Sequence, residues 1–147
     1  MPIRDASIQD AEAIRDLVLS LSHLYLANQH SSLPEWFANT LRLDVIRVSL
    51  TDHDQLNLLY ETDGEVVGYA AIKNNIHISQ LFVATTHQRQ GIARQLWQQV
   101  MQRCKAQVYT VRSSLYAVPV YQRFGFKMSE AVAEKDGIFY QPMEYVV

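Results

Sequence analysis

Cysteine is almost absent from this sequence: Cys104 is the only one in 147 residues. A single thiol excludes an internal disulfide framework and a cysteine-clustered metal site, and it fits a reducing compartment. Glycine and proline are also scarce, with 5 and 4 residues, which excludes a collagen-like or broadly disordered chain. The composition therefore predicts one globular domain over residues 1–147, with a cytoplasmic location.

No charge of one sign dominates, because 13 Lys and Arg stand against 15 Asp and Glu for a net charge of -2. The chain lacks the basic block that a strong nucleic-acid binder needs for phosphate contacts, so we expect no nucleic-acid partner. No apolar run approaches the roughly 18 residues of a membrane span, and residues 1–5 do not resemble a secretion signal, so we expect neither feature. The five histidines show no close pairing, so we expect no metal site.

The first half of the chain alternates between helical and strand-like patterns. Apolar residues recur at helical spacing over residues 14–25, after Ser7 and Asp10 in the positions of a capping box. Pro34 suits the first turn of a second helix, which breaks before a further helical stretch at residues 44–50. A short strand near the N-terminus completes this part of the prediction.

A β-hairpin is the clearest element in the middle of the chain. Strand-like runs at residues 56–62 and 65–72 flank Asp63 and Gly64, a dipeptide that accepts the positive φ angles of a tight turn. A further strand is predicted at residues 77–83. The alternation of helices and strands predicts a mixed α/β fold.

The second half begins with a polar loop and a long helix after Gly91. Its apolar residues repeat every four positions and end at Cys104, which we expect to be buried. The Glu134-Lys135-Asp136 segment is typical of a solvated turn. The remaining predicted elements are a strand at 108–112, a short helix at 114–124, and strands at 126–128 and 138–146.

Two short motifs carry chemical information. Residues 88–93 read Gln-Arg-Gln-Gly-Ile-Ala at the junction of loop and helix, and residues 121–126 read Tyr-Gln-Arg-Phe-Gly-Phe. A glycine and a small residue let a ligand approach the backbone, while free amides and the helix dipole favour an anion such as a pyrophosphate. No Walker-type loop or dinucleotide fingerprint is present, which excludes nucleotide hydrolysis and nicotinamide chemistry.

Together these motifs resemble those of the GNAT acetyltransferase superfamily, and the predicted elements follow the family order over nearly the whole chain. The resemblance implies an acyl-CoA N-acyltransferase fold, with a mixed and mostly antiparallel sheet flanked by helices. It also implies acetyl-CoA as the cosubstrate and no metal. The predicted activity is direct transfer of acetyl from acetyl-CoA to a primary amine.

The resemblance places acetyl-CoA along strand 77–83 and on the start of the following helix. In this family that strand splays from the next one and leaves backbone groups for the pantetheine arm. Many relatives carry an Asn after the second strand, whose side chain contacts the pantetheine. This chain has Ser113 and Ser114 there, and either serine could replace that contact or cap the next helix. The residues expected to bind the cofactor are Leu81, Phe82, Val83, Gln88, Arg89, Gln90, Gly91, Ile92, Ala93, Arg94 and Ser113.

Two residues are expected to handle protons. The resemblance places Tyr121 as a hydrogen-bond donor to the CoA sulfur, and the amide near Val83 as a donor to the thioester oxygen. Many relatives carry Glu where this chain has His77, and a histidine with a pKa near ~6.5 is able to accept the amine proton. A histidine on a strand is more often a half-buried structural residue, so the base stays open.

The acceptor is a primary amine of an unidentified small molecule or protein. His23, His30, Tyr25 and Trp36 lie where the family forms its acceptor pocket, although aromatic residues on such helices are also typical of a core. Dimers are common in the family, so a homodimer is an open expectation. Two alternatives remain: a catalytically weak acyl-CoA sensor, favoured by the missing Glu at position 77, and a toxin-like aminoacyl-tRNA acetyltransferase, disfavoured by the net charge.

Overall fold

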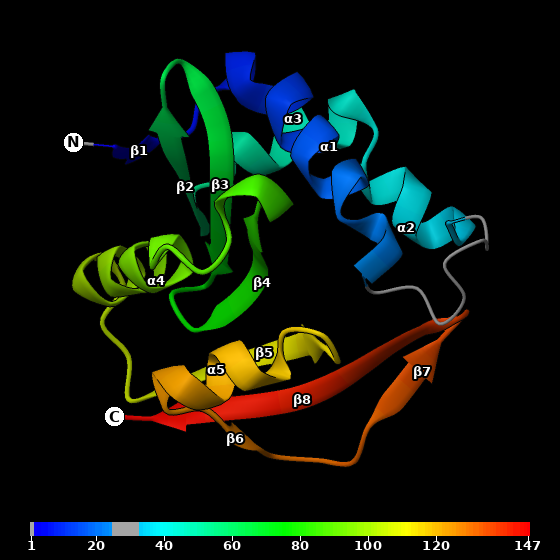
Figure 1. Ribbon diagram of the computed structural model, residues 1–147, viewed down its shortest axis with the longest axis vertical. Coiled ribbons are helices and arrows are strands. Elements are labelled where there is room, and N and C mark those ends of the chain that lie inside the picture. The colour runs from blue at the N-terminus through cyan, green and yellow to red at the C-terminus, as the bar shows by residue number, and fades with distance from the viewer. Residues whose placement is uncertain (1, 25–32) are drawn as a thin grey trace.

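A computed structural model describes residues 2–24 and 33–147, and its elements follow the predicted order (Figure 1). The helices are α1 (Ala11–Ser20), α2 (Glu35–Thr40), α3 (Leu43–Leu50), α4 (Ile92–Arg103) and α5 (Val118–Phe124). The strands are β1 (Ile3–Asp5), β2 (Gln55–Thr62), β3 (Glu65–Lys73), β4 (His77–Val83), β5 (Val108–Ser114), β6 (Lys127–Met128), β7 (Ala133–Lys135) and β8 (Ile138–Val146). Within the described ranges, no helix has the length and hydropathy to cross a membrane.

All these strands form one sheet, in the order β1-β2-β3-β4-β5-β8-β6, with β7 also paired to β8. Every pairing is antiparallel except that of β4 with β5, which is parallel. This confirms the predicted α/β fold with a mixed, mostly antiparallel sheet and flanking helices. The predicted hairpin is also present, with φ angles of 53° at Asp63 and 74° at Gly64.

Two hydrophobic clusters cover the two faces of the sheet. On one face α4 packs against β3, and its Trp97 lies edge-on to Tyr109 with ring centroids 5.0 Å apart. On the other face α1 and α3 cover Leu59 and Tyr69. Gly68 on β3 allows α4 to pack close to the sheet, because a Cβ at this position would lie only 3.1 Å from Leu96 Cδ1 on α4.

The start of α1 is fixed by Asp10. Its carboxylate accepts hydrogen bonds from the Ser7 amide at 2.7 Å and from the Arg4 guanidinium at 2.8 Å, as the predicted capping box requires. The bonds from Arg4 lower the pKa of Asp10 to about 2. This anchors α1 at the edge of the sheet, on the face opposite to α4.

The structure corrects two boundaries. The predicted helix 114–124 begins only at Val118, because Ser114 still pairs with Tyr140 on β8 and Pro119 occupies the first turn of α5. The predicted turn at 134–136 is displaced as well: Lys135 belongs to the short edge strand β7, and the positive φ angles occur at Asp136 and Gly137. Charged side chains on β7 are typical of an edge strand.

Cys104 follows α4 and is 3% exposed, as predicted. Its burial raises the pKa of the thiol, which lowers its reactivity at neutral pH. Tyr25 and His30, two residues of the predicted acceptor region, lie outside the described residues. His23 is described and is exposed on the 3-10 turn Ser22–Leu24.

Candidate functional site

The parallel pair of strands, β4 and β5, is joined at one end and open at the other. Register exists only between His77 and Thr110 and between Ile78 and Val111. Beyond Ile78, β4 continues to Val83 beside β3 alone, and Figure 1 shows β4 and β5 diverging. The divergence that the resemblance implied is therefore present in this chain.

The open end of β4 exposes backbone hydrogen-bonding groups. In an antiparallel ladder, successive residues direct their N–H and C=O groups to opposite sides of the strand. The Ala84 amide donates to Val67 on β3 at 2.8 Å, so the Val83 amide faces away from β3. Leu81, two residues earlier, faces the same way. These groups point toward the side from which β5 has diverged, where no strand of the described part of the chain pairs with them.

The start of α4 adds free amides to this region. Gly91 is the N-cap, adopts a left-handed conformation with φ 80°, and has no side chain to cap the helix. The first helical bond runs from the Gln95 amide to the Gly91 carbonyl, at 3.0 Å. The amides of residues 92–94 therefore lack a helical partner and carry the positive end of the helix dipole.

A cavity of about 790 Å³ lies between these features and α5. It brings together ten of the predicted residues, from β4, the loop before α4, the first turn of α4, and α5. Its lining comprises Leu21, Leu24, Leu81, Phe82, Val83, His87, Gln88, Arg89, Gly91, Ile92, Ala93, Arg94, Ser114, Tyr116, Ala117, Pro119, Val120, Tyr121, Arg123 and Phe124.

The charge around this cavity is positive. Arg89, Arg94 and Arg123 line it, and no Asp or Glu is among its lining residues. None of these arginines forms an ion pair with a described residue, whereas Arg4 and Arg103 do. Arg94 instead stacks its guanidinium over the Phe124 ring, 5.5 Å from the centroid. The cavity is therefore prepared for an anion with several phosphate oxygens.

Tyr121 lies on α5 in the wall of the cavity and is 4% exposed. Its ring packs edge-on against Phe126, with centroids 5.3 Å apart. The hydroxyl has no hydrogen-bond partner among the residues that the structure describes. Burial raises the pKa of Tyr121, so the hydroxyl keeps its proton and is able to donate it in a hydrogen bond.

His77 lies at the joined end of β4, outside the lining of the cavity. Its Nδ1 is 2.8 Å from the Thr110 hydroxyl oxygen, across the parallel pair. Burial, with a smaller effect from the positive charge of Arg112, lowers the pKa of His77. The ring is therefore neutral at pH 7, but the structure gives no support to its predicted role as the base.

Two predicted binding residues also lie outside the lining. Gln90 is exposed in the loop, and Ser113 is 1% exposed, with its hydroxyl donating to the Ser114 carbonyl at 2.7 Å. Ser114 lines the cavity instead, because Tyr109, Val111 and Ser113 share the buried face of β5. The alternation of burial along a strand was the signal that could have separated the two serines.

Several lining residues were missed by the sequence analysis. Arg123 was the easiest to find, since it is an unassigned cation inside the second motif. Tyr116 had no such signal, because its partner Gln88 is 28 residues away in sequence. Leu21 and Leu24 come from the end of α1 and the turn after it, which only the folded chain brings to β4.

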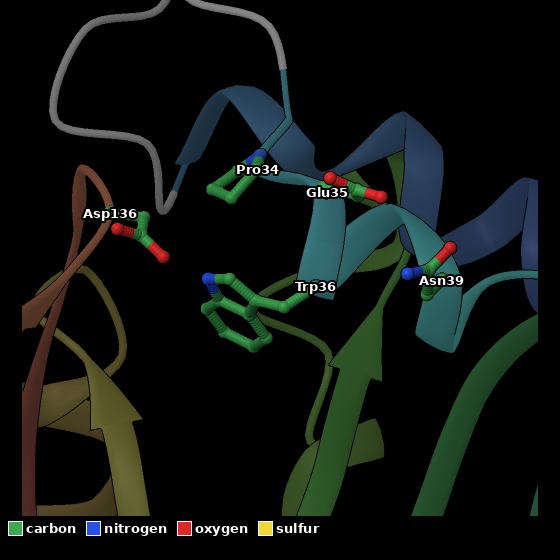
Figure 2. A pocket seen from close by; sticks show the side chains of 5 residues that line it. All are labelled: Pro34, Glu35, Trp36, Asn39 and Asp136. Atoms are coloured by element: carbon green, nitrogen blue, oxygen red, sulfur yellow. The ribbon is translucent and has the colours of Figure 1, made fainter.

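A second cavity, of about 470 Å³, lies between α2 and the turn that joins β7 to β8. It is lined by Pro34, Glu35, Trp36, Asn39 and Asp136, and Figure 2 shows the Trp36 indole reaching toward Asp136. The Lys135 ammonium lies over the Trp36 ring, 4.1 Å from its centroid. This cavity shares no lining residue with the first, so Trp36 is not placed beside Tyr121.

No group of three or more His, Cys, Asp or Glu side chains able to hold a metal ion occurs in the described ranges. The first cavity offers backbone amides and arginine side chains to a ligand. The unpaired backbone of β4 suits a ligand that carries amides, and the α4 amides and the arginines suit one that carries phosphates.

Comparison with known proteins identifies the family. The model of the acetyltransferase (GNAT) domain matches residues 13–147. The chain belongs to the GNAT acetyltransferase family. A search of curated protein sequences finds no match. Solved GNAT structures share the fold at low sequence identity.

A GCN5-related N-acetyltransferase from Rhodopseudomonas palustris is 18% identical, with a TM-score of 0.77 over 99% of this chain and 94% of that one. The PaiA N-acetyltransferase from Thermoplasma acidophilum, in complex with coenzyme A, is 15% identical, with a TM-score of 0.76 over 99% and 98%. An aminoglycoside 6'-N-acetyltransferase, also complexed with coenzyme A, is 10% identical, with a TM-score of 0.73 over 99% and 97%. These GNAT structures are similar in fold over almost their whole length.

Proposed function

We propose that the protein transfers the acetyl group of acetyl-CoA to a primary amine of a small molecule or protein. One observation carries the proposal: a single cavity combines unpaired strand backbone, free helix amides, unpaired arginines and a buried tyrosine hydroxyl. Acetyl-CoA offers a matching partner for each, through its pantetheine amides, its phosphates and its sulfur. Two solved structures of similar fold are complexes with coenzyme A, which supports the same ligand here.

In the proposed complex the pyrophosphate binds the amides of residues 92–94, and the pantetheine arm pairs with β4 at Leu81 and Val83. The Val83 carbonyl accepts a hydrogen bond from the Gln88 side chain at 3.0 Å. The backbone amide of Val83 is left to donate a hydrogen bond to the pantetheine or to the thioester oxygen. A donor held in place there stabilises the negative charge that develops on that oxygen during attack.

Transfer forms a bond from the amine nitrogen to the carbonyl carbon and breaks the carbon–sulfur bond. The departing sulfur resembles a thiolate with a pKa of about 8.5, so full proton transfer from a tyrosine with the ordinary pKa of about 10 is unfavourable by roughly 2 kcal/mol. The raised pKa of Tyr121 makes that transfer less favourable still. We therefore assign Tyr121 as a hydrogen-bond donor to the sulfur. The raised pKa of Tyr121 keeps that donor protonated throughout the physiological range.

The amine must lose a proton before it attacks, because an alkyl ammonium with a pKa near ~10.4 is not a nucleophile. His77 does not line the cavity, so we assign no side chain as the base and route this proton to water. The acceptor remains any primary amine able to reach the thioester. The acyl donor is proposed to be acetyl-CoA.

The proposal is tested by following thiol release from acetyl-CoA in the presence of a panel of primary amines, with mass spectrometry of the products. We expect release that depends on an amine and a product heavier by one acetyl group. Tight binding of CoA without turnover on any amine would instead support an acyl-CoA sensor. Absence of CoA binding would overturn the proposal altogether.

A further inference from the structure

Tyr116 lies in the turn between β5 and α5, and it is 51% exposed. Its hydroxyl nevertheless has a defined partner, because it donates a hydrogen bond to Gln88 Oε1 at 2.8 Å. Both residues line the first cavity, Gln88 from the loop between β4 and α4 and Tyr116 from the turn between β5 and α5. The bond therefore joins the wall of the cavity that β4 and α4 form to the wall that β5 and α5 form.

The other end of the Gln88 side chain is bonded as well. Its Nε2 donates to the Val83 carbonyl at 3.0 Å, at the end of β4. Gln88 thus uses its amide oxygen and its amide nitrogen at the same time, which fixes the rotation of the side chain. Tyr116, Gln88 and Val83 form a chain of two hydrogen bonds.

This chain joins the two walls where the sheet does not. Strand pairing between β4 and β5 ends at Ile78, and Val83 lies five residues beyond that point. The loop that follows contains two residues in left-handed conformations, Arg89 with φ 64° and Gly91 with φ 80°. Residues 85–87 of this loop form a 3-10 turn, and residues 88–91 after it belong to no helix or strand. The two side-chain bonds of Gln88 therefore help to set where residues 88–91, and the start of α4 after them, lie.

We propose that Tyr116 is a positioning residue for the cofactor: through Gln88, it holds residues 88–91 and the free amides at the start of α4 in the geometry that binds acyl-CoA. This inference rests on the proposed function, since it concerns the same cavity. Tyr116 acts by ordering the loop before the ligand arrives, so that binding does not have to supply the ordering free energy. It takes no part in the chemical step.

The test is the affinity for CoA of the Tyr116→Phe variant, measured by calorimetry. Loss of one neutral hydrogen bond predicts binding that is roughly two- to tenfold weaker. Gln88→Met loses both bonds and should bind more weakly still, and adding Tyr116→Phe to Gln88→Met should cause no further loss. Tyr60→Phe, on β2 and outside the cavity lining, is the matched control and should bind as the wild type does.

Kinetics separate positioning from a merely structural role. In Tyr116→Phe the KM for acetyl-CoA should rise in parallel with the dissociation constant, while kcat at saturating acetyl-CoA stays within about twofold. Because Tyr116 is half exposed, the thermal unfolding midpoint of the Tyr116→Phe variant should match that of the Tyr60→Phe control. A fall in kcat, or a lowered unfolding midpoint alone, would contradict the assignment.

The outcomes also separate this inference from the proposed function. If the wild type does not bind CoA, the proposed function fails, and this inference fails with it. If the wild type binds CoA and Tyr116→Phe binds equally well, only the role of Tyr116 is overturned. Tighter binding by the variant would show that the bond competes with the ligand. Additive losses in the double variant would show that Tyr116 contacts CoA directly, and either result also overturns the proposal.

Discussion

The two ends of β4 lie in different environments. At one end, His77 is paired on both sides, to Lys73 on β3 and to Thr110 on β5. At the other end, Val83 is paired to β3 alone and faces a cavity of about 790 Å³. His77 and Val83 are six positions apart on β4. The first lies in a closed environment between two strands, and the second lies at an open edge beside the cavity.

From this difference we infer that the strand binds acyl-CoA through its backbone at the open end, whereas it packs through its side chains at the closed end. Backbone recognition needs only an unpaired strand edge, so it places few demands on the side chains of Leu81, Phe82 and Val83. His77, at the closed end, has the chemistry of a base but does not line the cavity. Its role as the base therefore stays a prediction.

Gly91→Glu should have the largest effect, because it places a negative charge and a side chain at the open end. A carboxylate beside the free amides of residues 92–94 would occupy them and repel the pyrophosphate. We expect CoA affinity to fall by more than roughly a hundredfold in calorimetry.

The matched control for this variant is Gly64→Glu, in the β2–β3 turn. Gly64 and Gly91 have similar φ angles, 74° and 80°, and neither has an atom within 4 Å of an added Cβ. Both variants therefore carry similar backbone strain, but only one lies at the cavity. Equal loss of CoA affinity in the two variants would show that strain, and not the anion site, is responsible.

Tyr121→Phe should have the next largest effect, and it acts on turnover. The change removes only the hydroxyl, so the ring contacts with Phe124 and Phe126 persist. Loss of a hydrogen bond to a charged group is worth about 1.5–3 kcal/mol, which predicts a fall in kcat of roughly ten- to a hundredfold. The KM for acetyl-CoA should change much less, as steady-state kinetics would show. Turnover within twofold of the wild type would mean that the hydroxyl is dispensable.

His77→Asn should have the smallest effect on catalysis. Because His77 lies outside the cavity, we expect a decrease far below the 10²–10⁴-fold that loss of a general base costs. The pH–rate profile should keep its shape. A hundredfold loss of turnover, together with the disappearance of an ionisation near neutral pH, would restore His77 as the base.

The same variant should change how stability depends on pH. Burial lowers the pKa of His77 in the folded protein below its ordinary value of 6.5. As the pH falls below about 6.5, the unfolded chain gains a proton on this residue before the folded one does, so the free energy of unfolding decreases. His77→Asn should flatten this decrease in denaturant titrations at pH 7 and pH 5. An unchanged slope would show that His77 is not the buried group responsible.

The residues proposed to bind the cofactor could be predicted from the sequence because the motif that marks them is a short, continuous stretch. The motif at residues 88–93 places a glycine at the start of α4, where a residue with a positive φ and no side chain leaves the amides free. The hairpin at Asp63 and Gly64 was equally local. In each case a short stretch of sequence determines the geometry by itself.

The remaining features depend on contacts between distant segments. The bond between Tyr116 and Gln88, and the approach of Leu21 to the cavity, arise only after the chain has folded. The exclusion of His77 from the cavity depends on where β5 stops pairing with β4, which no motif marks. Ser113 and Ser114 are intermediate, since the burial alternation along β5 distinguishes them once the strand is known to continue to residue 114.

The most direct test of the difference between the two ends of β4 is a crystal structure with acetyl-CoA bound. We expect the pantetheine amides to be hydrogen-bonded to the backbone of Leu81 and Val83, at about 2.7–3.2 Å. We also expect the pyrophosphate on the amides of residues 92–94 and the sulfur beside the Tyr121 hydroxyl. Acetyl-CoA bound elsewhere, or a thioester placed beside His77 and away from Tyr121, would contradict this assignment of the two ends.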